Sequence, residues 1–265
     1  MSSGTVAVRD SLDLKGLNLS PNAWLSDIVG WPCLTVCELS SLGDDEYHRK
    51  SGRCFFEAKV PVGQGARTED LIRRGFSLID TSLTLRRDVS CGNFPRVCAD
   101  SRLSRSDDLY INAARPEEAI AVASIASRAF KYSRFHLDPR FPEECAQRIK
   151  GEWARNLVSG LRGEGCLVAR RGNRVVGFLG YLRPMQQDAP NVIDLVAVDP
   201  SEQGTGVGKE IVAMFLASAD NDRREVIVGT QAVNRSSVRL YENLGFRLDS
   251  ADYVLHGHCM TPPNQ

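Results

Sequence analysis

Three glycines spaced two residues apart, Gly204, Gly206 and Gly208, lie in the segment VAVDPSEQGTGVGKE at 196–210. An apolar run at 191–198 precedes them and an amphipathic run follows, so they are expected to join a buried strand to the start of a helix. Such a turn exposes main-chain N–H groups, and the missing side chains let an anion approach closely. The pattern therefore predicts a phosphate or pyrophosphate site. A glycine-rich helix cap without a ligand is the simpler alternative.

The surroundings of this glycine loop exclude two familiar nucleotide sites. A dinucleotide-binding fold carries its loop after the first strand of a βαβ unit, whereas here the loop follows an expected antiparallel hairpin. A P-loop needs a Gly-Lys pair followed by Ser or Thr, but Glu210 follows Lys209. Gln203 and Lys209 offer additional donors to a bound anion.

The elements expected around the loop follow the order β-α-α-β-β-β-α-β-α-β, which is an α+β arrangement. Gly172 and Asn173 mark a tight hairpin, and Ile149, Trp153 and Leu157 lie on one helical face. The expected strands cover 109–113, 166–171, 174–182, 191–198, 225–230 and 251–255. The expected helices cover 116–130, 143–158, 204–218 and 236–244.

A polar stretch at 88–108, interrupted by Gly and Pro, has the composition of a linker. It predicts a small N-terminal α/β domain with its linker at 1–105 and a catalytic domain at 106–265. Shifting the chain by 170 positions lays Gly75-Phe76 over Gly245-Phe246, and FFEAKV at 55–60 over EVIVGT at 225–230. A decayed duplication and coincidence both explain this. The first copy lacks the glycine loop, so no cofactor is expected there.

Composition sets broad limits on function. The chain has 33 basic and 33 acidic residues, so a broad nucleic-acid surface is not expected. It has no secretory signal at its start and no run of 18 apolar residues, which predicts a cytoplasmic protein without membrane insertion. Eight cysteines include no C-x-x-C pair, so reduced thiols and no metal site are expected.

Three separated motifs resemble the GNAT superfamily of N-acetyltransferases: the strand LVAVDP at 195–200, the Q-x-x-G-x-G loop, and LYENLGF at 240–246 after Asn234. The resemblance implies a mixed central sheet, flanked by helices, whose strands at 192–198 and 225–230 splay apart. The smaller N-terminal domain is then a candidate degenerate half-GNAT. Acetyl-CoA is the implied co-substrate, contacting Leu195, Val196, Val198, Gln203, Gly204, Thr205, Gly206, Val207, Gly208, Lys209 and Asn234.

Acetyl transfer to an amine needs a proton acceptor for the amine and an acid for the leaving thiolate. The resemblance makes Tyr241 the candidate acid, and a packed helix aromatic is the alternative. Asp194 is a candidate base, directly or through water, or a solvated strand-end residue. Asn234 suits a pantetheine amide or a bound water, or else it caps the helix that begins near Ser236.

Within the superfamily, the chain looks most like the TDP-fucosamine acetyltransferase type. RAFKYSRF at 128–135, PEECAQRI at 142–149 and GTQ at 229–231 support this. The implied acceptor is a small-molecule amine, a nucleotide-linked amino sugar of the dTDP-amino-dideoxy-hexose type used for surface polysaccharide. Homodimerisation stays open. Candidate acceptor residues are Arg134, His136, Asp138, Arg140 and Gln231.

Each acceptor candidate also has a simpler interpretation. Asp138 precedes Pro139 and suits a plain turn, and the two arginines suit solvated surface positions. His256 and His258 follow the last expected strand and are interpreted as edge or tail residues. Rival functions are acetylation of an antibiotic, another small amine or a protein N-terminus, and a non-catalytic acetyl-CoA sensor.

Overall fold

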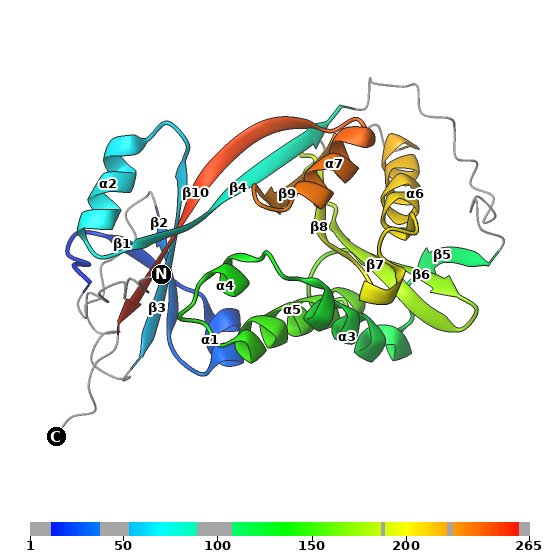
Figure 1. Ribbon diagram of the computed structural model, residues 1–265, viewed down its shortest axis with the longest axis horizontal. Coiled ribbons are helices and arrows are strands. Elements are labelled where there is room, and N and C mark those ends of the chain that lie inside the picture. The colour runs from blue at the N-terminus through cyan, green and yellow to red at the C-terminus, as the bar shows by residue number, and fades with distance from the viewer. Residues whose placement is uncertain (1–11, 38–52, 89–107, 187–188, 222–224, 260–265) are drawn as a thin grey trace, which may run out of the picture. The chain divides into compact units, whose positions relative to one another are not determined.

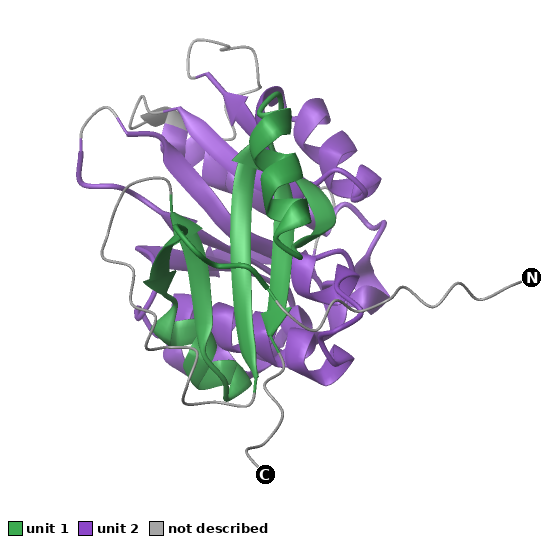
Figure 2. Ribbon diagram, turned by 90° about the vertical axis from the view of Figure 1, so that its left-hand side faces the viewer, with its two compact units in different colours: residues 1–81, 252–265 green, residues 82–251 purple. Residues whose placement is uncertain are grey.

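Contacts within the chain divide it into two compact units. The computed structural model describes residues 12–37, 53–88, 108–186, 189–221 and 225–259. Unit 1 comprises residues 1–81 and 252–265, and unit 2 comprises residues 82–251 (Figure 2). Strands β4 (Ser77–Arg87) and β10 (Arg247–Cys259) each belong partly to both units. The domain boundary expected at 105/106 lies outside the described residues.

Unit 2 is built on a mixed sheet. Strands β5 (Leu109–Ala113), β6 (Gly165–Arg171), β7 (Arg174–Leu182) and β8 (Asn191–Val198) are antiparallel neighbours in that order. Strand β9 (Val226–Gln231) then joins β8 in parallel, and the end of β4 pairs with β9 antiparallel. The parallel β8–β9 pair makes the sheet mixed and follows from the helical crossover between these strands.

Helices cover both faces of this sheet (Figure 1). On one face, α3 (Ala119–Ala129) and α5 (Glu143–Val158) pack with the buried side chains of Phe178 and Leu195. On the other face, α6 (Val207–Asn221) and α7 (Arg235–Asn243) pack with Leu179 and Ile193. Because side chains alternate along a strand, neighbouring residues such as Phe178 and Leu179 supply opposite cores. The α+β arrangement predicted from the sequence, a mixed sheet flanked by helices, is thereby confirmed.

Local sequence accounts for the elements around the site. Helix α5 buries Ala146, Ile149, Ala154 and Leu157, which lie three, five and three residues apart and fall on one apolar face of the helix. Strands β6 and β7 are joined across Gly172, whose φ of 56° is the left-handed conformation that a two-residue hairpin requires. The predicted helix over 143–158 and the predicted hairpin are both confirmed.

Three elements differ from the sequence-based expectation. The helix expected from Gly204 begins at Val207, because Gly204 and Gly206 adopt left-handed φ values of 80° and 95° that a helix cannot continue through. The last strand, expected over 251–255, extends as β10 over thirteen residues because two different strands support its two halves. A short helix, α4 (Arg134–Leu137), forms in what was expected to be a loop.

Unit 1 is a smaller α/β unit. Its strands β1 (Asn18–Pro21), β2 (Cys33–Cys37) and β3 (Cys54–Pro61) are followed by the second half of β10. Strands β2 and β3 are parallel, and β10 is antiparallel to β3. Helices α1 (Ala23–Val29) and α2 (Gly65–Arg73) complete the unit. Its core gathers Leu34, Phe56, Val60, Leu71 and Leu255.

The strand registers of the two units repeat the 170-residue shift seen in the sequence. In unit 2, β4 pairs with β9 from Ser82↔Gln231 onward. In unit 1, β10 pairs with β3 from Asp252↔Pro61 onward, and each position differs from its counterpart by 170. The last strand of each repeat, β4 or β10, therefore pairs with the first strand of the other repeat, β9 or β3. This shared register supports the interpretation of a duplicated strand–helix–strand element, which stays a prediction.

The described helices include none with both the length and the apolar character needed to cross a membrane.

Candidate active site

Strands β8 and β9 are paired at one end and separate at the other. Three residue pairs join them, from Asn191↔Val226 to Ile193↔Val228, and no further pair is recorded along their described lengths. On its opposite edge, β8 stays paired with β7 as far as Val198. Beyond Ile193, the main-chain groups of β8 that face away from β7 are therefore left for another partner, since buried N–H and C=O groups need hydrogen bonds. An extended ligand carrying amides fits this gap.

A β-bulge lies where the strands separate. The β7–β8 register pairs Leu195 with Gly180 and Ile193 with Tyr181, so Asp194 is the extra residue on β8. One extra residue reverses the faces occupied by the side chains that follow. Ile193 accordingly packs beside α6 and α7, whereas Leu195 packs beside α3 and α5. The bulge directs the Asp194 carboxylate toward α5.

The glycine loop connects β8 to α6. After the 3₁₀ turn η3 (Pro200–Glu202), Gly204 and Gly206 take left-handed φ values, and a Cβ added at either glycine would meet nothing within 4 Å. The Gly206 carbonyl accepts the Lys209 and Glu210 N–H groups at 2.9 and 3.1 Å, which starts the helix. The open side of both glycines is therefore the side from which a ligand can approach.

The N-terminus of α6 presents unused donors. The amides of Gly206, Val207 and Gly208 donate to no acceptor within the described part of the chain. At a helix N-terminus these N–H groups and the helix dipole together favour an anion. A Cβ added at Gly208 would approach the Val198 side chain at 3.4 Å, so this glycine also lets α6 pack closely on β8. The arrangement agrees with the predicted pyrophosphate cradle.

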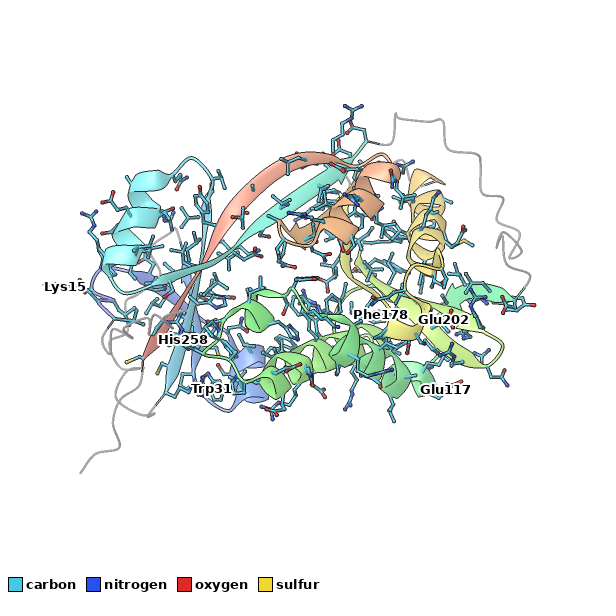
Figure 3. The ribbon with its side chains drawn as sticks, in the orientation of Figure 1. Lys15, Trp31, Glu117, Phe178, Glu202 and His258 are labelled. Atoms are coloured by element: carbon cyan, nitrogen blue, oxygen red, sulfur yellow. The ribbon has the colours of Figure 1, made fainter. Side chains whose placement is uncertain are left out.

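Ion pairs hold the loop to the rest of the sheet. Glu202, which is labelled in Figure 3, accepts the Arg171 Nε–H at 3.1 Å. Glu202 also pairs with Arg174 on the β6–β7 hairpin. The Thr205 hydroxyl donates to the Glu202 carbonyl at 2.7 Å, and the Gln203 amide donates to the Val198 carbonyl at 3.2 Å. Thr205 and Gln203 thus shape the loop, whereas Lys209 is exposed beside it.

Tyr241 lies on α7 and is 2% exposed, within the core cluster beneath α6 and α7. Its ring packs edge-on against Phe246, with 5.5 Å between the ring centroids. Burial raises the pKa of the phenol above its ordinary value, so the hydroxyl keeps its proton throughout the physiological range. This protonated state is the one that a general acid requires. The acid role itself stays a prediction.

Asn234 is the N-cap of α7. Its Oδ1 accepts the Ser237 N–H at 3.3 Å and the Ser236 hydroxyl at 2.9 Å. The capping alternative raised from the sequence is therefore confirmed. Because capping uses only the side-chain oxygen, the amide nitrogen keeps its donors for a ligand, and the cofactor contact stays a prediction.

Asp194 is held in an ion pair. Its side chain is 8% exposed, and its two oxygens accept Arg162 Nε–H and Nη2–H at 2.6 and 2.8 Å. Trp153 Nε1–H adds a third hydrogen bond of 2.7 Å. These three hydrogen bonds, two of them charge-assisted, occupy both oxygens of the carboxylate and fix its orientation. This geometry suits a positioning role for Asp194, and the base role stays a prediction.

Lys150 is a buried residue of the site that sequence reasoning missed. It lies on α5, is 7% exposed, and its ammonium nitrogen stands 4.8 Å from the Phe130 ring centroid and 4.5 Å from the Trp153 ring centroid. Burial, followed by the charge of Arg134, lowers the pKa of Lys150 to about 7. Its spacing from Trp153 and Leu157 put it on the apolar stripe of the helix, which is the sequence signal that could have revealed it.

The predicted acceptor residues lie on and after α4. The His136 Nδ1 is 2.6 Å from the Ser133 hydroxyl, and burial, then the charge of Lys150, lowers the pKa of His136. Asp138 is buried and accepts the main-chain N–H and Nε–H of Arg140 at 3.0 and 3.2 Å. The guanidinium of Arg134 lies 4.5 Å from the Phe135 ring centroid.

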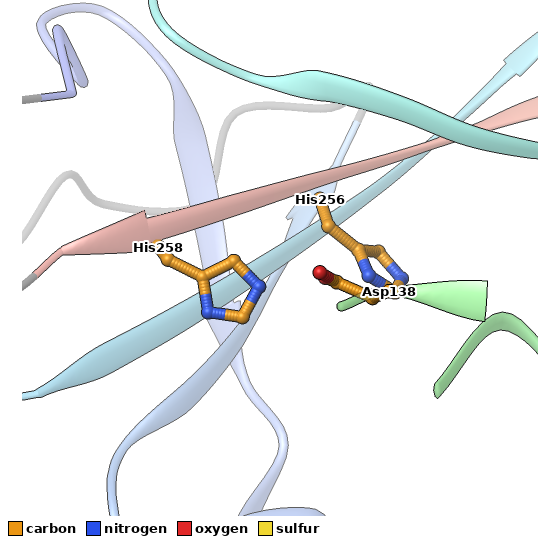
Figure 4. Close-up of side chains that lie close together, drawn as sticks. All are labelled: Asp138, His256 and His258. Carbon is orange, nitrogen blue, oxygen red and sulfur yellow. The ribbon is translucent and has the colours of Figure 1, made fainter. Parts of the chain in front are cut away.

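The remaining predicted residues lie on strands β9 and β10. Gln231 ends β9 and pairs with Ser82 of β4. Figure 4 draws His256 and His258 of unit 1, together with Asp138 of unit 2. Within unit 1, both histidines are buried beside Phe55, with ring centroids 4.8 and 5.2 Å away. They belong to the interior of β10 rather than to a tail, because that strand is longer than expected.

Comparison with known proteins shows which family and which individual proteins the chain resembles. Residues 121–246 match the acetyltransferase (GNAT) family. The chain is similar to SpsD, a spore coat polysaccharide biosynthesis protein of Bacillus subtilis, with 31% identity over 142 residues, 53% of this chain and 48% of that protein. It is 30% identical to mycothiol acetyltransferase of Thermomonospora curvata over 114 residues, 43% of this chain and 38% of that protein.

A likeness to solved structures agrees. A tandem GNAT protein from the clavulanic acid biosynthesis pathway, solved without acetyl-CoA, has a TM-score of 0.57 at 12% identity, covering 89% of this chain and 77% of that one. That likeness shows the fold. The chain spans about half or less of the length of the two curated relatives. Residues 121–246 therefore resemble the acetyltransferase (GNAT) family both in sequence and in fold, and the enzymes of that family use acetyl-CoA as co-substrate.

Proposed function

We propose that unit 2 binds acetyl-CoA and transfers its acetyl group to the primary amine of a nucleotide-linked amino sugar. The separation of β8 from β9 after three residue pairs, directly beside the unused amides of the glycine loop, carries the acetyl-CoA assignment. One region offers hydrogen bonds to an extended amide-bearing chain, and the adjacent region offers donors to a pyrophosphate. Both features match coenzyme A.

The residues present fit this co-substrate. Leu195, Val196 and Val198, the predicted main-chain contacts, lie on the part of β8 that has no recorded pairing with β9, where pantetheine amides would bind. The amides of Gly206 to Gly208 would hold the phosphates, with Lys209 at the rim. Acetyl-CoA supplies an acetyl group activated as a thioester.

The reaction forms an N–C bond and breaks a C–S bond, and the chain must move two protons. The acceptor ammonium loses one before attack, and the departing sulfur gains one. Tyr241 is proposed as the donor to sulfur, since its buried phenol stays protonated. The pKa of this phenol lies above that of a thiol, which is about 8.5. Proton transfer to the leaving thiolate therefore contributes only moderately to the rate.

The acceptor class rests on one relative and on the acceptor-side residues. SpsD is named for polysaccharide biosynthesis, which fits an amino sugar acceptor. Arg134 lies on α4 and Arg140 follows it, and both suit bidentate contact with a diphosphate. His136, Asp138 and Gln231 complete the proposed acceptor set. A cytoplasmic location, a dimeric state and the absence of a nucleic-acid partner stay predictions.

An amine panel tests this function. Free-thiol release from acetyl-CoA is followed with dTDP-linked 4-amino sugars, the same sugars without nucleotide, peptides with free N-termini, and a small aminoglycoside. We expect the highest kcat/KM with a nucleotide amino sugar. Preference for a peptide or an unlinked amine would overturn the acceptor class alone. Thiol release with no amine in the panel, despite acetyl-CoA binding, would favour a non-catalytic sensor.

A further inference from the structure

Lys150 occupies an unusual position for a lysine. Its side chain is more than nine-tenths buried. The ammonium nitrogen lies near the ring of Phe130, the residue that follows α3, and near the ring of Trp153, one turn further along α5. Among the described residues, no hydrogen bond or ion pair uses its nitrogen. Two aromatic faces attract an ammonium only weakly compared with a carboxylate, so the charged form is poorly compensated there.

The charged groups around Lys150 favour its neutral form. Arg134 on α4 and Arg162 after α5 are the nearby cations, and His136 on α4 is coupled to the same lysine. Asp194 on β8 is the nearby carboxylate, but Arg162 and Trp153 already engage both of its oxygens. Burial is the largest cause of the lowered pKa, which is about 7, and the arginines add to it.

The position also connects Lys150 to the point where the strands separate. Trp153 is stacked 4.5 Å from the lysine nitrogen and donates a 2.7 Å hydrogen bond to Asp194, the bulge residue of β8. One ring therefore separates Lys150 from the bulge at which β8 and β9 part. Lys150 lies on the face of the sheet that α3 and α5 cover. The core that contains Tyr241 lies on the opposite face.

We propose that Lys150 is the general base that removes the proton from the acceptor ammonium. The proposal rests on the proposed transfer of acetyl to an amine. Neutral Lys150 Nζ accepts one proton from the acceptor nitrogen, which becomes a neutral amine and forms the N–C bond while the C–S bond breaks. The lysine ammonium then returns its proton to water, which its unfavourable surroundings promote. Asp194 is a positioning residue that orients Trp153 and Arg162.

The alternative role for a buried lysine is to bind an anion. Arg134 and Arg162 are better suited to that role, because a guanidinium stays charged in any surroundings whereas this lysine loses its charge near neutral pH. Arginine at position 150 separates the two roles. It supplies a permanent cation of similar reach but cannot accept a proton.

The test compares Lys150→Arg and Lys150→Met with the control Lys131→Met, which removes an exposed lysine before α4. Acetyl transfer to the best amine of the panel is measured from pH 5.5 to 9.5. In the wild type we expect kcat/KM to rise through about pH 7. Both Lys150 variants should lose about 10²- to 10³-fold at pH 7 and lack that limb, with unchanged acetyl-CoA affinity. Lys131→Met should behave as wild type.

A direct titration gives a readout that does not depend on activity. NMR of protein carrying ¹³C at lysine Cε should show one resonance titrating near pH 7, identified by its disappearance in Lys150→Arg. A wild-type rate in Lys150→Arg, or a Lys150 titration above pH 9.5, overturns the proposal. If the wild type is active, either result overturns only the role of Lys150 and not the proposed acetyl transfer. A wild type that acetylates no amine removes both.

Discussion

Replacing Asp194 by asparagine separates a positioning role from a catalytic one. The change keeps the shape of the side chain, removes its charge and replaces one accepting oxygen with a donor NH2 group. Only one of the two oxygens that accept from Arg162 is kept, and the hydrogen bond to it loses its ionic component. Removing one partner of a buried charge-assisted interaction costs about 1–3 kcal/mol. We expect the lower half of that range, because Arg162 is 40% exposed and can turn to solvent.

Two measurements follow from Asp194→Asn. Chemical denaturation should show a loss of about 1–2 kcal/mol in the free energy of unfolding of unit 2. The control is Glu152→Gln, which breaks a 3.4 Å ion pair with Arg155 on the exposed side of α5 and should cost under about 0.5 kcal/mol. A loss no larger than that of the control would mean that the Arg162 ion pair contributes nothing.

The same variant also tests the assignment of the base. Asp194 raises the pKa of Lys150, so removing its charge should move the rising limb of kcat/KM to lower pH. We expect at most about a tenfold loss of kcat/KM, from imperfect positioning of Trp153. A loss of about 10³-fold, with the limb near pH 7 abolished, would instead make Asp194 the base and refute the reasoning.

Three further predictions concern the acid, the glycine loop and the buried lysine. Tyr241→Phe should lower turnover about 10²- to 10⁴-fold with little change in acetyl-CoA affinity, and an unchanged rate in steady-state assays would remove Tyr241 from the mechanism. Gly206→Ala should weaken acetyl-CoA binding by calorimetry, whereas Gly172→Ala, which strains a hairpin with similarly open space, should not. Lys150 holds its proton less tightly in the folded chain, with a pKa of about 7 against 10.5, so its contribution to stability rises with pH between those values. Lys150→Met should therefore raise the melting temperature at pH 6 and lose that advantage toward pH 10; a constant difference across this range would contradict the lowered pKa.

The elements around the site were predictable because local rules determine them. The apolar stripe of α5 and the Gly172-Asn173 hairpin need only neighbouring residues. The glycine loop was equally clear, although its glycines delay the start of α6 until Val207. The 170-residue repeat anticipated two similar strand–helix–strand elements, but the exchange of their last strands depends on long-range pairing.

The acceptor side could not be predicted at the same level. The ion pair of Asp194 with Arg162 joins residues 32 positions apart, and the bulge that aims the carboxylate depends on the register between β7 and β8. From its residue type alone, Lys150 would be taken for a solvated helix residue. Only its spacing from the apolar residues of α5 indicates that it is buried. Asn234 could not be assigned from the sequence for a different reason. Its position suits both a helix cap and the predicted ligand contact, and sequence spacing does not distinguish the two roles.

Isothermal titration of the full chain with acetyl-CoA addresses the central claim most directly. The separated strands and the glycine loop occur once, in unit 2, among the described residues, so we predict saturable binding of one molecule per chain. Binding should weaken in Gly206→Ala and persist in Gly172→Ala. Folded wild-type protein that releases no heat with millimolar acetyl-CoA, or that binds equally well in Gly206→Ala, would contradict the assignment of this loop.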